Sequence, residues 1–293
     1  MLARTVACAV IMSVGISVVG TPQRDRPKVQ GEDHLLASGS VGVGFGERTD
    51  VEAGVEMAGV TWDGDADAVI AVRGLTPDGT WSAWSELVGE ADEGPDRASP
   101  EHRARRGAGP AWLGHDMREV ETRVVSGRVS GLEMHAIDTE AVTESPSPFG
   151  LATTNAAPSS PLLVTRAQWG ADESWRNLGN PGCDGQPRYA SNVQFSVVHH
   201  TADSNDYSAA DVPALLRGIY YFHTHDRGWC DVAYNFFIDR FGRGFEGRAG
   251  GIDQAVIGGH TGGFNTGSTG VAVIGNFDTA SVPDAAYSAL RSL

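Results

Sequence analysis

Three short stretches in the second half of this 293-residue chain carry side chains that could do chemistry. His199-His200 ends an apolar stretch, Tyr234-Asn235 begins another, and His260 and Asn265 lie in a Gly-rich segment. Neutral imidazole is the commonest metal ligand, and a tyrosine hydroxyl can donate to a developing oxyanion. Each stretch alone equally fits a structural histidine, a core tyrosine or an ordinary turn, so the interpretation depends on their combination.

The region that contains these stretches, residues 163–293, has the hydrophobic pattern of a mixed α/β domain. Apolar residues at helical spacing follow Asp211, a good N-cap, and Pro213 fits the first turn of that helix. The other predicted elements are a strand ending at His199-His200, strands over 232–239, near Phe245 and over 271–274, and a last helix from about Pro283.

Residues 39–141 indicate a smaller β-rich domain. Apolar and polar residues alternate over 121–125 and 132–137, which predicts strands of an antiparallel sandwich or barrel. The stretch from 89 to 109 is rich in charged residues, Gly and Pro, and we expect it to be an exposed loop.

This first domain offers little chemistry. Trp81 and Trp84 could stack on a sugar, but residues three apart on a strand face opposite sides, so we expect at least one in the core. His102, His115 and His135 are isolated in the sequence from one another and from any cysteine, and we expect them to be solvated.

The N-terminal residues 1–20 are predicted to be a secretory signal peptide. Arg4 precedes the apolar run Thr5–Val19, whose 15 residues are too few to cross about 30 Å of hydrocarbon as a helix. A buried N-terminal helix is the alternative. Residues 21–38 are predicted to be a leader, and the Pro-, Ser- and Ala-rich residues 142–162 a linker between the domains.

Export would place the mature chain in an oxidising compartment. Cys8 lies in the predicted signal peptide, which leaves Cys183 and Cys230 as an even pair. We expect these two cysteines to form a disulfide, with two buried free thiols as the alternative.

The balance of charge argues against two classes of partner. The chain has 37 acidic and 22 basic residues, a formal net charge of −15. Because nucleic acids and anionic membrane surfaces are bound mainly through Lys and Arg, we expect neither as a partner. No segment after the signal peptide reaches 18 apolar residues, so no membrane span is predicted in the mature chain.

Five motifs in the second domain resemble, in order, those of the type 2 N-acetylmuramoyl-L-alanine amidases, the group that includes the peptidoglycan recognition proteins. The resemblance covers residues 163–293, and the β-rich first half is similar to the domain that precedes this module in exported actinobacterial members. The motifs are Arg166–Ala171, Val197–Ala202, Gly228–Phe236 with Phe245–Arg248 after it, Gly258–Asn265 and Thr269–Phe277.

The resemblance implies a mixed central sheet with flanking helices, and a secreted, cell-wall-associated zinc amidase. Such an enzyme cleaves the amide between the lactyl group of N-acetylmuramic acid and L-alanine in bacterial peptidoglycan. Two His and one Cys hold Zn²⁺ in the family, which leaves one position open for water. By motif, His199 is the first metal ligand, Tyr234 assists at the tetrahedral intermediate, and His260 and Asn265 line the muropeptide groove.

Two departures from the family pattern bear on this activity. The second His and the Cys ligand belong to a downstream motif, and the sequence ends at Leu293 before it, in a helix without a stop signal. We therefore expect a domain truncated at its C-terminus. Some relatives also carry a Glu base in the strand equivalent to Val271–Ile274, which is apolar here. On motif grounds, Cys230, His223 and His225 do not replace the missing ligands.

Three hypotheses remain open at this point. The chain is an exported zinc amidase, a non-catalytic peptidoglycan-binding module, or a poorly folded product without function. The presence of His199 and Tyr234 favours the first. The missing ligands favour the other two, because a single His holds zinc weakly.

Overall fold

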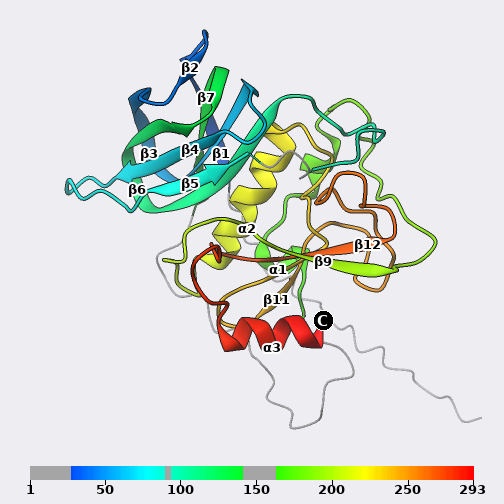
Figure 1. The fold of residues 1–293 in the computed structure, drawn as a ribbon. Coiled ribbons are helices and arrows are strands. Elements are labelled where there is room, and N and C mark those ends of the chain that lie inside the picture. Colours follow the sequence, from blue (N-terminus) through cyan, green and yellow to red (C-terminus); the bar gives the residue numbers. More distant parts are fainter. Residues whose placement is uncertain (1–27, 90–93, 141–162) are drawn as a thin grey trace, which may run out of the picture.

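The protein is described by a computed structural model that covers residues 28–89, 94–140 and 163–293. Two domains pack against each other in it (Figure 1). The predicted fold class, a β-rich domain followed by a mixed α/β domain, is confirmed. The predicted signal peptide and linker lie outside the described residues.

The first domain is one antiparallel sheet in the order β1-β7-β3-β6-β4-β5, with β2 paired to β7. The long strand β3 shifts register against β6 between Asp50 and Val55, and such bulges bend a strand. The bent sheet encloses a core that includes Trp62, Ile70 and Met134. The strands are β1 (Gln30–Ala37), β2 (Val41–Gly42), β3 (Gly46–Gly64), β4 (Val69–Leu75), β5 (Ser85–Val88), β6 (Arg106–Ser126) and β7 (Arg128–Asp138).

The sheet begins earlier in the chain than predicted. Residues 21–38 are the predicted leader, yet Gln30–Ala37 form β1, which pairs with β7 from Gln30 opposite Asp138 onward. β1 lies at the edge of the sheet, and none of its side chains is fully buried. An edge strand of this kind lacks the apolar alternation that would reveal it in the sequence.

The expectation that Trp81 or Trp84 lies in the core is wrong. Both rings are half-buried and contact the guanidinium group of Arg73, which lies 4.3 Å from the centroid of Trp81 and 4.4 Å from that of Trp84. The strand β5 begins only at Ser85, so the alternation of a regular strand does not apply to these two residues.

The second domain contains a five-stranded mixed sheet in the order β8-β11-β10-β12-β9. The strand β12 is parallel to its two neighbours β10 and β9, while β11 runs antiparallel to β10. Its elements are β8 (Leu163–Val164), α1 (Arg166–Trp169), η1 (Glu173–Asn177), β9 (Phe195–His200), α2 (Val212–Tyr221), η2 (Phe222–Asp226), β10 (Phe236–Ile238), β11 (Gly244–Glu246), β12 (Ser268–Val273) and α3 (Asp284–Ser292).

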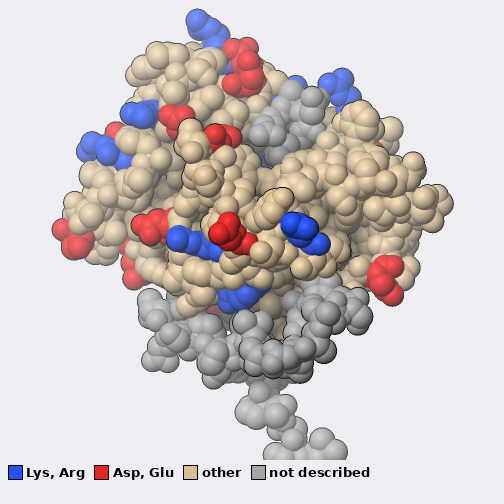
Figure 2. Space-filling model, turned by 60° about the horizontal axis from the view of Figure 1, so that its bottom comes forward, with Lys and Arg blue, Asp and Glu red and all other residues tan. Residues whose placement is uncertain are grey.

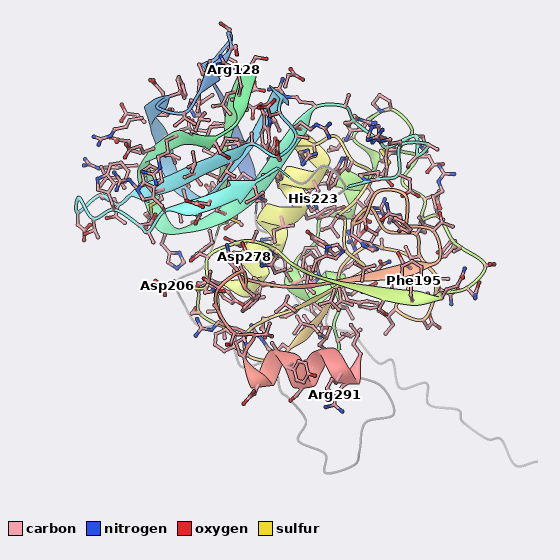
Figure 3. All side chains as sticks on the ribbon, viewed as in Figure 1. Arg128, Phe195, Asp206, His223, Asp278 and Arg291 are labelled. Carbon is pink, nitrogen blue, oxygen red and sulfur yellow. A yellow bond between two sulfur atoms is a disulfide. The ribbon has the colours of Figure 1, made fainter. Side chains whose placement is uncertain are left out.

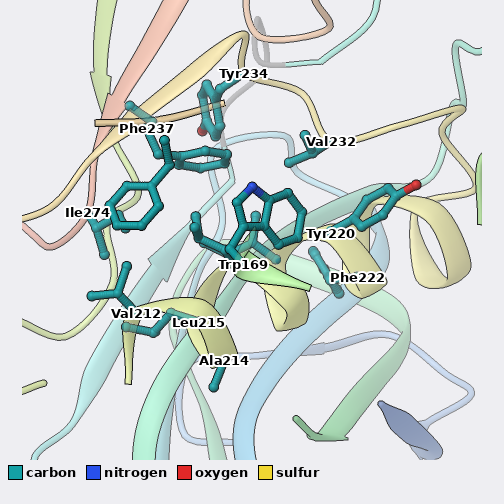
Figure 4. Close-up of a cluster of buried hydrophobic side chains, with 14 of the residues drawn as sticks. Trp169, Val212, Ala214, Leu215, Tyr220, Phe222, Val232, Tyr234, Phe237 and Ile274 are labelled. Atoms are coloured by element: carbon teal, nitrogen blue, oxygen red, sulfur yellow. The ribbon is translucent and has the colours of Figure 1, made fainter. Parts of the chain in front are cut away.

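Successive side chains along β10 and β12 point to opposite faces of this sheet, and a helix packs on each face. Phe237 and Ala272 belong to the larger core with the apolar side of α2, where Trp169 and Tyr220 also lie (Figure 4). Ile238 and Val273 belong to a smaller cluster that contains Ala286 of α3. The sheet is therefore a layer between α2 and α3 (Figure 1).

The two domains share a continuous apolar interface. Met57, Trp112 and Ile137 of the first domain belong to the same buried cluster as α2. Gly59 on β3 and Gly218 on α2 permit this close approach, since a Cβ would strike Phe222 from Gly59 and Met57 from Gly218. The relative placement of the domains is thus set by side-chain packing.

The stretch from 89 to 109 is not the exposed loop that its composition predicted. Of its described residues, Gly94, Pro95 and Glu101 are buried, and the Glu101 carboxylate accepts from Nη2 of Arg248, with Oε2 to Nη2 2.7 Å. Charged side chains here pair across the domain interface, which composition alone could not show. On the face in Figure 2, acidic and basic side chains are interspersed.

Candidate active site

His199 lies where the parallel strands of the second domain end. It is the fifth residue of β9, opposite Ala272 of β12, and its side chain is half-buried. The strand ends at His200 as predicted. β9 is the edge strand, and Phe195 at its start is 45% exposed (Figure 3).

Tyr234 faces His199, as the order of motifs indicated. The two ring centroids are 5.4 Å apart, and Tyr234 is buried beside Phe237 (Figure 4). The predicted strand over 232–239 is shorter, because β10 begins at Phe236. Before that point Asn235 continues the ladder with its side chain, whose Oδ1 accepts from the Gly270 amide at 2.8 Å.

His260 lies next to His199, with His260 Nδ1 3.1 Å from His199 Nε2. Its ring lies against the backbone of β12 at Gly270, where any Cβ would clash with the imidazole. Burial lowers the pKa of His260 to about 3, and the nearby charges of His199 and Arg248 act in the same direction. His260 is therefore neutral over the physiological pH range and can donate or accept one hydrogen bond toward His199.

Asn265 is fully buried and shapes the loop that carries His260. Its Oδ1 accepts from the His260 amide at 2.8 Å, and its Nδ2 donates to Asp96 Oδ1 at 2.7 Å. Nδ2 also donates to the Gly94 carbonyl at 3.0 Å, so the first domain covers this loop. The predicted contact of Asn265 with a substrate stays a prediction.

His223, which does not match a ligand motif in the sequence, lies next to Tyr234. Its ring centroid is 6.2 Å from that of Tyr234, and its Nδ1 accepts from the Ala233 amide at 3.2 Å. Burial lowers the pKa of His223, as do the charges of Arg227 and Arg248. Its position at the end of a helix gave no sign in the sequence that it would lie beside Tyr234.

Two cavities lie between the domains near these residues. The smaller, of about 50 Å³, has His200, His223, Tyr234 and His260 in its wall, and residues 107–109 of the first domain close it. The larger, of about 370 Å³, is bounded by Arg176, Arg188, Arg248 and Gly258 of the second domain and by Asp96 and Glu101 of the first.

The described residues around His199 offer two imidazoles to a metal ion. Among the residues that the structure describes, the only set of three ligand atoms within 4.8 Å of one another belongs to Asp33, His135 and Asp226. His199 and His260 therefore do not complete a three-ligand zinc site by themselves.

The predicted disulfide between Cys183 and Cys230 is confirmed, with an S–S distance of 2.00 Å. It ties the loop after η1 to the turn before Tyr234. The Cys230 amide also donates to Glu101 Oε2 at 3.0 Å, which links this turn to the first domain.

Sequence profiles of known families match both domains. One described as N-acetylmuramoyl-L-alanine amidase matches residues 189–293. Through its second domain, the chain belongs to the N-acetylmuramoyl-L-alanine amidase family. A profile described as Rv3811 N-terminal galactose-binding domain-like matches residues 23–161, which contain the first domain.

Curated relatives of the amidase-family domain are peptidoglycan recognition proteins. Peptidoglycan recognition protein 1 of Bos taurus is 33% identical over 132 residues, and that of Mus musculus is 35% identical over 130 residues. The matches cover 45% and 43% of this chain and 63% of each relative. The chain thus spans just under two thirds of the length of these relatives.

Solved structures similar to the amidase-family domain include two further recognition proteins. Drosophila PGRP-LB is 27% identical with a TM-score of 0.38, over 45% of this chain and 71% of that one. Peptidoglycan recognition protein-LE, solved in complex with tracheal cytotoxin, is 30% identical with a TM-score of 0.37, over 44% and 69%. Among the described residues, no helix is both long and apolar enough to cross a membrane.

Proposed function

We propose that this protein is an exported N-acetylmuramoyl-L-alanine amidase that hydrolyses the lactyl–L-alanine amide of bacterial peptidoglycan. The observation that carries the proposal is the position of His199 and Tyr234. Two motifs separated by 35 positions in the sequence meet beside β9, with ring centroids 5.4 Å apart. The two side chains would combine a metal-ligating imidazole with an oxyanion donor, which are two elements of metal-assisted amide hydrolysis.

Zinc is the metal proposed for this reaction, with His199 as a ligand. When bound, it would supply a nucleophilic water and polarise the amide carbonyl. The described residues place only His260 beside His199, so they do not fit a complete zinc site. The other ligands of the family pattern belong to a motif that is not part of this sequence, and we derive no step through the metal.

The remaining roles follow from the chain's own residues. The Tyr234 hydroxyl, held in a buried side chain, would donate to the oxyanion that forms when the amide is attacked. Neutral His260 would hold the ring of His199 through their hydrogen bond. The cavity of about 50 Å³ beside Tyr234 has room for one or two water molecules at about 30 Å³ each. The cavity of about 370 Å³ is in the size range of ligand sites and would receive part of the muropeptide.

A non-catalytic peptidoglycan-binding module is the second candidate function. It is favoured by the hydrogen bond between His199 Nε2 and His260 Nδ1, because a metal ion at that nitrogen of His199 would have to displace His260. It is also favoured by the incomplete set of ligands around His199.

Release of new L-alanine amino termini from purified peptidoglycan separates the two candidates. We expect release by a chain that includes the downstream His and Cys ligands and is supplied with Zn²⁺, and loss of release in its His199→Ala variant. His102→Ala, which removes an exposed histidine, is the matched control and should behave as the parent. Equal release by His199→Ala and the parent would refute the proposal. Retention of muropeptide by both without release would establish the binding module instead.

A further inference from the structure

A second group of ionisable side chains meets at the domain interface, remote in sequence from His199. Asp33 on β1 and His135 on β7 come from the first domain, and Asp226 ends η2 of the second. His135 Nδ1 is 2.7 Å from Asp33 Oδ1 and 3.6 Å from Asp226 Oδ1. The expectation that His135 is solvated is therefore wrong, since its side chain is only 5% exposed.

Asp226 brings a buried carboxylate that lacks full compensation. Its side chain is 7% exposed, and its Oδ2 has no hydrogen-bond partner among the described residues. Burial raises the pKa of Asp226 to about 7, although His135 acts in the opposite direction. A buried carboxylate left without partners is costly, and a cation beside it removes that cost.

The ring of His135 is held so that Nδ1 faces both carboxylates. On the other side of the ring, Nε2 is 2.8 Å from Thr61 Oγ1, which also accepts from Arg105 Nε at 3.0 Å. When Nε2–H donates to Thr61, the lone pair of Nδ1 points toward Asp33 and Asp226. A metal-ligating histidine is commonly fixed by a hydrogen bond of this kind at its second nitrogen.

We propose that Asp33, His135 and Asp226 form a binding site for a divalent transition-metal ion, with Zn²⁺ as the probe of choice, that ties the first domain to the second. One imidazole and two carboxylates are a donor set that Zn²⁺ accepts, with water in the fourth position. A metal ion bound at Nδ1 takes the place of any proton there.

The spacing needs only a small adjustment for an ion. Bonds of about 2.0–2.2 Å in a tetrahedron separate ligand atoms by roughly 3.3–3.6 Å. The distance between His135 Nδ1 and Asp226 Oδ1, 3.6 Å, already matches. Asp33 is too close at 2.7 Å, but its side chain is 62% exposed and can move outward. The buried side chains of His135 and Asp226 thus present two ligands, and the exposed Asp33 supplies the third.

The test uses the full chain carrying His199→Ala, so that zinc at the proposed active site does not contribute. Equilibrium dialysis against Zn²⁺ with metal analysis should give one bound zinc per chain. Added Asp226→Asn or Asp33→Asn should abolish this binding. Thr61→Val, which removes the hydroxyl that orients His135 and that also accepts from Arg105, should weaken it by about 10–100-fold. His34→Gln, on the same strand as Asp33, is the matched control and should bind as the parent.

A second readout is the thermal unfolding midpoint. Zn²⁺ should raise it in the His199→Ala chain but not after Asp33→Asn, because a ligand that binds only the folded state stabilises it. Asp33→Asn changes an exposed side chain, so it decides the question even where Asp226→Asn fails to fold. Absence of bound zinc in the His199→Ala chain, or unchanged zinc affinity in Asp33→Asn, would overturn the proposal.

Discussion

Two buried histidines at the domain interface differ in the charge of their neighbours, which is positive around one and negative around the other. His260 lies beside His199 and Arg248, whose charges add to the effect of burial and lower its pKa to about 3. His135 lies between Asp33 and Asp226, two carboxylates that attract a cation, whether a proton or a metal ion. Burial is similar at both positions, so the neighbouring charges decide which chemistry each imidazole can support.

The largest effect on the rate of hydrolysis is expected at Tyr234, which lies in the same group of residues as His260. If Tyr234 donates to the oxyanion, Tyr234→Phe should lower kcat for amide hydrolysis by about 10²–10³-fold. Muropeptide affinity should remain unchanged, because the donor acts mainly in the transition state. Steady-state kinetics and a separate binding measurement provide the two numbers.

Tyr287→Phe is the matched control, since Tyr287 is 54% exposed on α3. Its kcat should equal that of the parent. A parent-like kcat in Tyr234→Phe would remove Tyr234 from the reaction.

An effect of comparable size, on stability instead of rate, is expected where Glu101 balances the charge of Arg248 beside His260. Glu101 of the first domain holds the buried guanidinium of Arg248, whose side chain is 8% exposed. Glu101→Gln should lower the free energy of unfolding by about 3–5 kcal/mol, because it leaves Arg248 uncompensated. Urea unfolding measures this loss. Asp63→Asn, at a side chain 65% exposed, should change stability by less than about 0.5 kcal/mol. Equal stabilities of the two variants would contradict this account of the interface.

The third effect, spread over several pH units, is a difference in the direction of the pH dependence. In the unfolded chain His260 takes up a proton near pH 6.5, but in the folded chain only near pH 3. Stability should therefore fall as the pH drops from about 6.5 toward 3, by at most about 1.4 kcal/mol per pH unit. Asp226 binds its proton more tightly when folded, with a pKa near 7 against 3.8, so its contribution falls as the pH rises from about 4 to 7.

Urea unfolding at several pH values, without added metal, tests whether His260 and Asp226 make stability depend on pH in opposite directions. His260→Gln should flatten the loss of stability below pH 6.5, and Asp226→Asn the loss between pH 4 and 7. Parallel curves for both variants and the parent would show that the two surroundings do not differ as described.

The parts predicted from the sequence are those determined by local pattern. His199 and Tyr234 lie in short motifs next to apolar strands, and each motif folds into its own element. The Cys183–Cys230 pair followed from the count of cysteines. Helix α2 followed from apolar residues at helical spacing.

The parts that escaped prediction depend on the packing of one domain against the other. His135 is buried only because η2 of the second domain lies against β7, with Asp226 beside it. Glu101 is buried because Arg248, 147 positions later, accompanies it into the interface. No pattern within the first domain reports contacts that the second domain makes.

The proposed activity is tested most directly by hydrolysis of one defined muropeptide in ¹⁸O-labelled water. The masses of the products are then measured by mass spectrometry. If the group around His199 and Tyr234 hydrolyses the lactyl–L-alanine amide, the label appears in the lactyl carboxylate of the sugar product. The stem peptide is then released without label and begins with L-alanine. Label in the stem peptide, or recovery of the muropeptide intact from a folded, zinc-supplied chain that includes the downstream His and Cys ligands, would contradict the account.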